Sequence, residues 1–441
     1  MLVQAVNGPR APEDGRHRMV SPGMLAPFIL VTALFFLWGL PNNLNDVLIR
    51  QFMKSFQLSR FQAGLIQSAF YCGYFVLATP AALLMRRFGY KLGMITGLCL
   101  LGSGTFLFWP AALVGRYWFF LLALFVIASG LSFLETASNP FIAQLGDPSG
   151  AARRLNFSQA FNPIGAITGV LAGTLFIFSG VELSPAQIAS MNVARTYKRY
   201  LREETLRVVN PYLVIGAFAF LLAFLIWRCR FPAVATESID GTLGNGSFKD
   251  LLRYPHFLTA ICAQFMYVGA QVGTWSYFIQ YVQDYTHSPE KTAGYLLTGT
   301  LLAFGIGRFF SAALMEKVSP SRLMGLYSII NILLLTAGVL QPGWTGLWAI
   351  FLSSFFMSVM YPTIFALGIE GLNVNTKIGA SLIIMAIIGG AVLTPLMGLI
   401  SQKAGNIAVA YTVPLGAYVF VALYAFWGAH LRPFALRNQK R

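Results

Sequence analysis

Long apolar stretches alternate with short polar gaps along almost the whole chain. A helix of about 20 apolar residues crosses the ~30 Å hydrocarbon core of a membrane. Runs of this kind occur at 26–48, 62–85, 93–114, 117–142, 158–180, 211–230, 257–283, 292–315, 321–341, 345–371, 377–402 and 407–430. They are continuous and lack the short alternating pattern of barrel strands. We therefore predict an all-α membrane protein with twelve transmembrane helices.

The predicted spans form two sets of six that repeat one another. The segment 82–87 after the second span returns as 312–317 after the eighth, and 140–146 at the end of the fourth span returns as 362–368 at the end of the tenth. Two such six-helix bundles, related by an axis along the membrane normal, are typical of secondary transporters that bind substrate at the seam.

The repeat and the polar gaps predict five parts of the chain. These are a cytoplasmic tail at 1–25, an N-terminal six-helix bundle at 26–230, a flexible cytoplasmic linker at 231–256, a C-terminal six-helix bundle at 257–430 and a cytoplasmic tail at 431–441. The segment 181–210 is the only sizeable external loop that this division leaves.

Composition and charge exclude several classes of protein. Only 10% of the residues are charged, whereas a soluble chain carries about a quarter. The net charge of +16 does not indicate nucleic-acid binding, because lysines and arginines are spread over alternate gaps between spans. This bias places both termini in the cytoplasm of a bacterial inner membrane. The cysteines and histidines show no metal-ligand spacing, so we expect no metal site.

Three charged residues fall inside predicted spans, where each costs about 2.5–3.5 kcal/mol on insertion scales. They are Asp46, Glu135 and Arg308. An alternative for Asp46 is that the first span ends at Pro41 and an external loop follows; for Glu135 it is a structural pair with a basic residue. We interpret Arg308, about two turns from the cytoplasmic end of its span, as a snorkelling or structural charge.

The two carboxylates are candidates for proton coupling. A carboxyl group in a low-dielectric interior favours its neutral form, so its movement between wet and dry surroundings takes up or releases a proton. By position in their spans, Asp46 lies toward the outer mouth and Glu135 lies deeper. The second half has Met357 where the repeat would place an acid, which predicts a polar first half and a more apolar second half.

Uncharged polar and aromatic residues accompany these acids in the predicted spans. Amides and phenols can bind sugar hydroxyls, and tryptophan rings can stack on the C–H face of a sugar; an interhelical hydrogen bond is the competing interpretation for each amide. The candidates are Trp38, Asn42, Asn43, Gln159, Asn162, Tyr267, Gln271 and Trp275. Gly165, Gly169 and Gly173, at spacing four, predict close helix packing.

Long segments resemble the fucose–galactose–glucose:proton symporter family of the major facilitator superfamily. The resemblance is carried by 35–46, 61–71, Leu134-Glu135-Thr136-Ala137-Ser138-Asn139-Pro140, 267–271 and Tyr361-Pro362-Thr363-Ile364-Phe365, and it extends over 26–429. It implies that Asp46 couples sugar binding to protonation and that Glu135 is the buried proton carrier. It also implies that Asn43 and Gln159 bind the sugar, and it adds Tyr361 to the candidate sugar site.

The sequence therefore predicts a proton-coupled symporter that imports a neutral monosaccharide, L-fucose or a related hexose or pentose, by alternating access. We expect a monomer whose partners are the sugar, protons and membrane lipid, with the proton as coupling ion and no cofactor. The alternatives are a proton-coupled exporter of small amphipathic compounds, a membrane glycosyltransferase and a passive pore. An enzyme would need a larger external domain than the segment 181–210 provides.

Overall fold

The computed structural model describes most of the chain. The described residues are 20, 23–145, 151–231, 248–315, 317–372 and 375–431. Most of the predicted tails and of the predicted linker, at 1–19, 21–22, 232–247 and 432–441, lies outside the described residues. So do residues 146 and 316 of the repeated segments.

Helices account for almost all of the described chain. In the first half they are α1 Leu25–Phe56, α2 Arg60–Phe106, α3 Phe108–Val114, α4 Tyr117–Gln144, α5 Ala151–Gln159, α6 Phe161–Ala172, η2 Gly173–Ile177, α7 Pro185–Val193, α8 Tyr197–Leu206 and α9 Val209–Arg228. In the second half they are α10 Phe248–Leu251, α11 Pro255–Ser276, α12 Phe278–Thr286, α13 Glu290–Leu314, α14 Pro320–Leu340, α15 Trp344–Met357, α16 Met360–Ile369, α17 Thr376–Met385, η5 Ala386–Ile388, α18 Gly389–Ala404, α19 Ile407–Ala410, α20 Thr412–Phe426 and η6 Gly428–His430.

Twelve helical segments in the described residues are long and apolar enough to cross a membrane, which confirms the predicted fold class. Most of them begin and end within a few residues of the predicted runs. The first continues to Phe56, and the sixth begins at Tyr197 instead of near 211. Helix α2 contains the second span and most of the third, which continues into α3. Gly89, at φ 82°, makes the turn between the two spans in a conformation that favours glycine.

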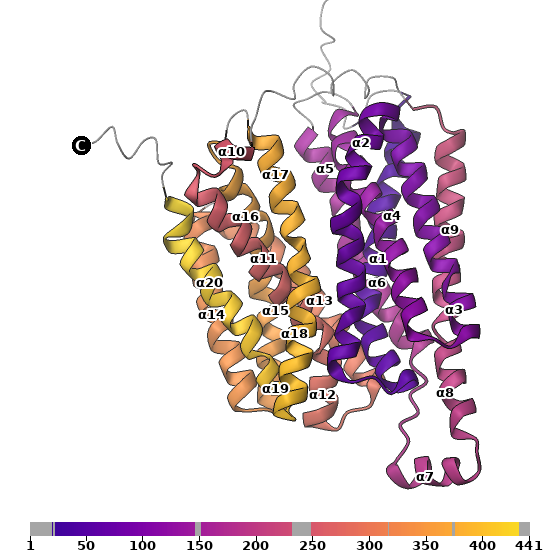
Figure 1. The fold of residues 1–441 in the computed structure, drawn as a ribbon. Coiled ribbons are helices and arrows are strands. Elements are labelled where there is room, and N and C mark those ends of the chain that lie inside the picture. The colour runs from indigo at the N-terminus through magenta and orange to yellow at the C-terminus, as the bar shows by residue number, and fades with distance from the viewer. Residues whose placement is uncertain are drawn as a thin grey trace, which may run out of the picture.

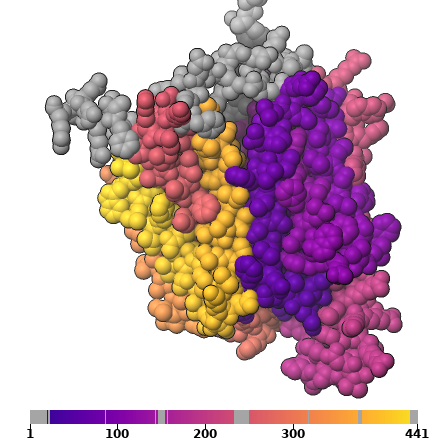
Figure 2. Space-filling model, viewed as in Figure 1, coloured from indigo at the N-terminus to yellow at the C-terminus, as the bar shows by residue number. Residues whose placement is uncertain are grey.

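The two halves of the chain stand side by side (Figure 1). Helices α1 to α9, indigo to magenta, form one bundle, and α11 to α20, red to yellow, form the other. Figure 2 shows the two sets of atoms meeting along one seam on this face. We call the end that carries α7, α12 and α19 the loop end, and the opposite end, with α5, α10 and α17, the linker end.

Helix α1 passes through its proline without ending. Pro41 lies inside α1, and the helix continues through Asp46, which is only 3% exposed. Membrane helices tolerate an internal proline because neighbouring groups satisfy the freed carbonyl. The alternative that Asp46 belongs to an external loop after Pro41 is therefore wrong.

Glycines allow α6 to pack directly on α1, as their spacing predicts. A Cβ on Gly165 would collide with the carbonyl oxygen of Phe36, and one on Gly169 with that of Leu40. A Cβ on Gly173, in the π-helical turn η2, would meet the Leu44 and Val47 side chains. The backbones of the two helices thus lie closer than larger side chains would permit.

The predicted loop 181–210 contains two short helices. Helix α7 begins with a capping box, in which the Ser184 hydroxyl accepts from the Gln187 amide and the Gln187 side chain accepts from the Ser184 amide. Helix α8 follows and leads into α9, so this segment is an ordered helical extension at the loop end (Figure 1).

Candidate functional site

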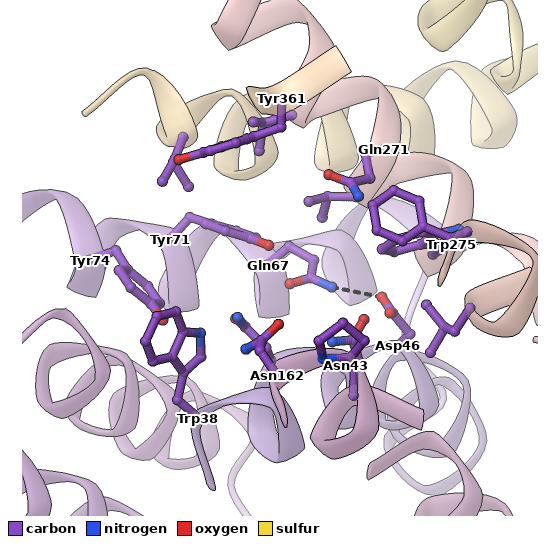
Figure 3. Close-up of a pocket in the computed structure, with 18 of the residues that line it drawn as sticks. Trp38, Asn43, Asp46, Gln67, Tyr71, Tyr74, Asn162, Gln271, Trp275 and Tyr361 are labelled. Atoms are coloured by element: carbon purple, nitrogen blue, oxygen red, sulfur yellow. Dashed lines mark hydrogen bonds between the residues drawn. The ribbon is translucent and has the colours of Figure 1, made fainter. Parts of the chain in front are cut away.

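A cavity of about 220 Å³ lies on the seam between the two halves (Figure 3). It brings together both candidate acids and seven of the nine candidate sugar-binding residues. The predicted residues on its wall are Trp38, Asn42, Asn43, Asp46, Glu135, Asn162, Gln271, Trp275 and Tyr361. Further wall residues, which the sequence did not indicate as site residues, are Gln67, Tyr71, Tyr74, Phe304 and Arg308.

One face of α1 supplies the polar floor of the cavity. Trp38, Asn42 and Asp46 are four residues apart, so they lie above one another on the same side of the helix. Asn43 borders the same face, and Asn162 reaches the cavity from α6, which packs against α1. The Oδ1 atom of Asn42 is buried without a hydrogen-bond partner, as expected where a ligand or water completes the site.

Helix α2 adds one face of polar and aromatic residues that were not among the predicted site residues. Gln67, Tyr71 and Tyr74 follow the i, i+4, i+7 spacing of one helical face, and all three point into the cavity (Figure 3). This spacing was readable in the sequence as a polar and aromatic face within an apolar span. The buried Oε1 atom of Gln67 also has no hydrogen-bond partner.

The second half closes the cavity with aromatic rings and fewer polar groups. Gln271 and Trp275 are one turn apart on α11, and Tyr361 comes from α16 (Figure 3). The Trp275 ring meets the Phe304 ring edge-on at a centroid distance of 5.2 Å, and its Nε1 donates to the Ser354 hydroxyl at 3.1 Å. The rigid tryptophan thereby presents an apolar face to the cavity.

The two carboxyl groups have different surroundings. Asp46 Oδ1 accepts hydrogen bonds from Gln67 Nε2 at 3.0 Å and from Ser276 Oγ at 2.9 Å. Glu135, on α4, is partly exposed to the cavity. Neither forms an ion pair with another described residue, so the alternative of a structural pair for Glu135 finds no basic partner there.

Arg308 is placed differently from its sequence interpretation. It lines the cavity, and its guanidinium lies over the Phe304 ring at 5.0 Å from the centroid. A cation–π contact of this kind holds the charge at the cavity wall of α13. The second half therefore contributes the basic group of the site, while the first half contributes both acids.

Two candidate sugar-binding residues lie outside this cavity. Tyr267 is fully buried, and its hydroxyl donates to the Met357 carbonyl at 2.8 Å. Gln159 ends α5 near the linker end with an exposed side chain, and its Nε2 donates to Asn139 Oδ1 at 3.1 Å. The described structure thus shows neither side chain on the cavity wall.

A second cavity, of about 380 Å³, continues from the first toward the linker end. Tyr71, Tyr74, Glu135 and Ile387 line both cavities. The remaining wall is formed by α2 as far as Ala82, by α4 as far as Pro140, by α17 and by Ile388 of η5. Glu135 therefore lies at the junction of the two cavities, whereas Asp46 lines only the first.

The loop end is closed by contacts between the halves. Lys54 Nζ, at the end of α1, lies 3.3 Å from Glu290 of α13 and 3.3 Å from Glu204 of α8. Both carboxylates are buried, and the backbone amide of Gly180 also donates to Glu290 at 2.9 Å. A second ion pair joins Arg60 of α2 to Asp284 of α12. The structure is thus shut at the loop end and hollow toward the linker end.

Comparisons with known proteins agree with this architecture. The family model of the Major Facilitator Superfamily matches residues 24–376. The chain is 43% identical to the L-fucose-proton symporter of Escherichia coli (strain K12), over 92% of this chain and 93% of that protein. It is 32% identical to the glucose/galactose transporter of Brucella abortus biovar 1 (strain 9-941), over 90% of this chain and 93% of that protein.

A solved structure extends the likeness to three dimensions. The crystal structure of the Major Facilitator Superfamily transporter FucP in the outward conformation shares 42% sequence identity and a TM-score of 0.68, covering 92% of this chain and 99% of that one. Both the sequence and the fold match over nearly the full length. The chain therefore belongs to the Major Facilitator Superfamily, within the family that includes these L-fucose and glucose/galactose transporters.

Proposed function

We infer that the protein imports a neutral monosaccharide together with protons, by alternating access of one central cavity to the two sides of the membrane. The observation that carries this inference is the pairing of two carboxyl groups, Asp46 and Glu135, with uncharged hydrogen-bonding groups in one cavity at the seam. Relatives of more than 30% identity are named as an L-fucose-proton symporter and as glucose/galactose transporters, and they support the same class of substrate.

The cavity wall suits a sugar. Asn42 and Gln67 offer buried amide oxygens without partners, which can accept hydrogen bonds from sugar hydroxyls. Trp38 and Trp275 come from opposite halves and offer flat apolar faces for the sugar C–H groups. The volume of about 220 Å³ is smaller than the roughly 300–1,000 Å³ of pockets for drug-sized ligands.

The two acids suit proton coupling. Both lie in the cavity without a basic partner among the described side chains, so a proton is the species that neutralises them when the cavity closes. One proton moving inward supplies about 2.3 kcal/mol per 100 mV, enough to concentrate a neutral sugar about 50-fold. We assign the sugar contacts to both halves and the proton chemistry to the first.

The distribution of basic residues sets the orientation that we propose. Lysines and arginines between spans favour the linker end as the cytoplasmic side of a bacterial inner membrane. With the loop end shut and a second cavity leading toward the linker end, the structure then corresponds to an inward-facing state. The protein would act as a monomer, since the cavity is complete within one chain.

The alternatives have less support. An exporter of amphipathic compounds would be expected to have a wide aromatic cavity, whereas this cavity is small and carries amides and acids on its wall. A passive pore would need a continuous path, whereas the loop end is closed by buried ion pairs. The full-length relatives are named as transporters, which favours transport over glycosyl transfer.

Uptake into proteoliposomes tests the proposal. Purified protein is reconstituted, an inward pH gradient is imposed, and accumulation of labelled L-fucose, D-galactose, D-glucose and L-arabinose is followed. We expect stereoselective accumulation of at least one sugar that a protonophore abolishes. Accumulation of none of them, or gradient-driven efflux of amphipathic dyes in its place, would overturn the assignment.

A further inference from the structure

A buried hydrogen-bonded triangle joins the two halves beside the cavity. Gln67 Nε2 lies 3.0 Å from Asp46 Oδ1 and 2.9 Å from Ser276 Oγ, and Ser276 Oγ lies 2.9 Å from the same Asp46 oxygen. The three residues are 3%, 2% and 0% exposed in the order Asp46, Gln67, Ser276. Asp46 and Gln67 belong to the first half, whereas Ser276 is the last residue of α11 in the second. The triangle therefore crosses the seam.

The triangle encloses the Asp46 carboxyl group without a counter-ion, and this burial favours the neutral form. Its Oδ1 accepts from two uncharged donors, which uses both lone pairs of a carbonyl oxygen. The other oxygen, Oδ2, is then free to carry the proton. An ionised carboxylate enclosed without a cation would be costly in a dry interior, and the described residues provide no cation within 4 Å.

Other ionisable groups surround Asp46 without an ion pair or hydrogen bond to it among the described side chains. On the cavity wall they are Tyr71 and Tyr74 of α2, Glu135 of α4, Arg308 of α13 and Tyr361 of α16. Further along α1, Lys54 is paired with Glu204 of α8 and Glu290 of α13, and Asp284 of α12 is paired with Arg60 of α2. The hydrogen bonds to Asp46 shown by the described chain come from Gln67 and Ser276.

We propose that Ser276 is a positioning residue that holds the loop end closed through Asp46, while the desolvation of that carboxyl group on closing makes closure depend on its protonation. Held by Gln67, its hydroxyl binds the protonated carboxyl group across the seam and so connects α11 to α1. This role of Ser276 rests on the proposed proton-coupled sugar transport. It adds the hydrogen bond by which the second half contacts the Asp46 carboxyl group of the first half.

The proposal follows from which helices carry the triangle. When the loop end opens, α11 and α1 separate, Ser276 leaves Asp46, and the carboxyl group meets water. It can then lose its proton without being enclosed as an anion. When it is protonated again, its burial no longer encloses a charge, and the halves close over the sugar with the Ser276 hydroxyl bound to Asp46. A charged Asp46 opposes the same closure because of its desolvation.

The experiment follows opening of the loop end against pH. Arg116, at the start of α4, and Lys403, near the end of α18, are exposed residues of opposite halves near the loop end. Spin labels are placed on Arg116→Cys and Lys403→Cys in a chain whose four native cysteines are replaced by alanine. Pulsed electron resonance on reconstituted protein then gives the fraction of molecules with the short, closed distance. All variants carry Glu135→Gln, so that Asp46 is the carboxyl group of the cavity wall that titrates.

Ser276→Ala should make closure harder for the protonated protein. Loss of one net hydrogen bond lowers the closed-to-open ratio by about two- to tenfold. Because closure stabilises the protonated form, a fivefold fall lowers the pH midpoint of closing by up to about 0.7 units when the closed state predominates. Gln67→Leu, which removes the other member of the triangle, should shift the midpoint in the same direction, and Ser276→Thr should restore it.

Ser68 provides a matched control on the same seam. Its hydroxyl donates at 2.6 Å to the backbone carbonyl of Ala391 in the second half, so it joins the halves without touching an acid. Ser68→Ala should lower closure by the same factor with Asp46 present or replaced by alanine. Ser276→Ala should lower closure by a larger factor with Asp46 present than with Asp46 replaced by alanine, where Ser276 keeps only its bond from Gln67. The difference between the two factors is the coupling energy of the double-mutant cycle.

Two results would overturn the proposal. One is an equal effect of Ser276→Ala in the Asp46 and Asp46→Ala backgrounds, which would make Ser276 a packing residue like Ser68. The other is an unchanged pH midpoint in both Ser276→Ala and Gln67→Leu. Sugar counterflow by the chain with unmodified Glu135 is measured separately. Absence of counterflow would reject sugar transport. If the chain exchanges sugar but the effects of Ser276→Ala and Asp46→Ala on the closed fraction are additive, only the role of Ser276 is rejected.

Discussion

The loop end and the linker end of the bundle are built differently. At the loop end, buried ion pairs and backbone donors join the halves through Lys54, Glu290 and Gly180. Toward the linker end, a cavity of about 380 Å³ separates α2 and α4 from α17. The difference places the two acids unequally, because Asp46 lines the first cavity alone, whereas Glu135 lines both cavities. One acid can thus be shielded while the other still reaches water at the linker end.

The largest effect on sugar accumulation should come from Glu135, at the junction of the two cavities. Glu135→Gln keeps the size and hydrogen bonding of the side chain but cannot lose a proton. We expect gradient-driven sugar accumulation to fall by about 50-fold per 100 mV, to the passive level, since one proton per cycle is no longer coupled. Counterflow of sugar, which needs no net proton movement, should persist in part. Labelled-sugar uptake with and without a pH gradient measures both, and undiminished accumulation would contradict the assignment.

The next effect concerns the closed loop end itself. Lys54→Ala leaves Glu204 and Glu290, which are 3% and 0% exposed, without their shared cation. Removing one partner of a buried ion pair costs about 3–5 kcal/mol, so the open loop end should gain more than about 100-fold in population. The distance between labels at 116 and 403 reports this. Arg199→Ala is the control, because Arg199 and Glu203 form an exposed pair on α8; equal distances in both variants would mean that Lys54 does not hold the halves together.

A smaller effect is expected at the shielded acid. Sugar affinity of the wild-type protein should fall by about tenfold as pH rises, which corresponds to about 1.4 kcal/mol, because the enclosed carboxyl group must be neutral. Asp46→Asn mimics the neutral form permanently, so its affinity should stay constant across the same pH range. Binding titrations in detergent measure this. A wild-type pH profile in Asp46→Asn would remove Asp46 from proton coupling.

The smallest effect on sugar should come from a tyrosine that lies off the cavity. Tyr267→Phe removes the hydrogen bond to the Met357 carbonyl and should cost about 1 kcal/mol of stability while leaving sugar affinity within about twofold. Tyr361→Phe, on the cavity wall, is the matched variant and should weaken binding about fivefold. Thermal unfolding and sugar binding, measured on both variants, distinguish a structural tyrosine from a sugar-binding one. A loss of sugar affinity in Tyr267→Phe would mean that Tyr267 contacts the sugar.

Much of the fold was predictable because the membrane imposes length and hydropathy on each span. The sequence placed most spans within a few residues, but it missed α7 and α8, although Ser184, Pro185 and Gln187 form a readable helix start. The segment 181–210 was predicted as a loop because it is polar, in spite of this helix start. The sixth span consequently begins earlier in the structure than its apolar run indicated.

The site was predictable where a polar group is expensive in a membrane. Asp46, Glu135 and the asparagines of α1 stood out for this reason. Gln67, Tyr71 and Tyr74 carried a weaker signal in their shared helical face. Ser276 gave none, because a serine hydroxyl inside an apolar helix can bond to its own backbone. Only the tertiary arrangement shows that it faces Asp46 from the other half.

The glycine contacts between α6 and α1 bear on how binding strength changes during a transport cycle. Gly165 and Gly169 set the carbonyls of Phe36 and Leu40 directly against α6, leaving no side chains that could slide or repack. We therefore expect the two helices to move as one rigid body, so that Asn43, Asp46 and Asn162 of the cavity wall keep their spacing whichever side is open. The first half would then bind the sugar with the same strength whether the cavity is open to the outside or to the inside of the cell. Release into the cell must then depend on the groups that travel with the other half, Gln271, Trp275 and Tyr361.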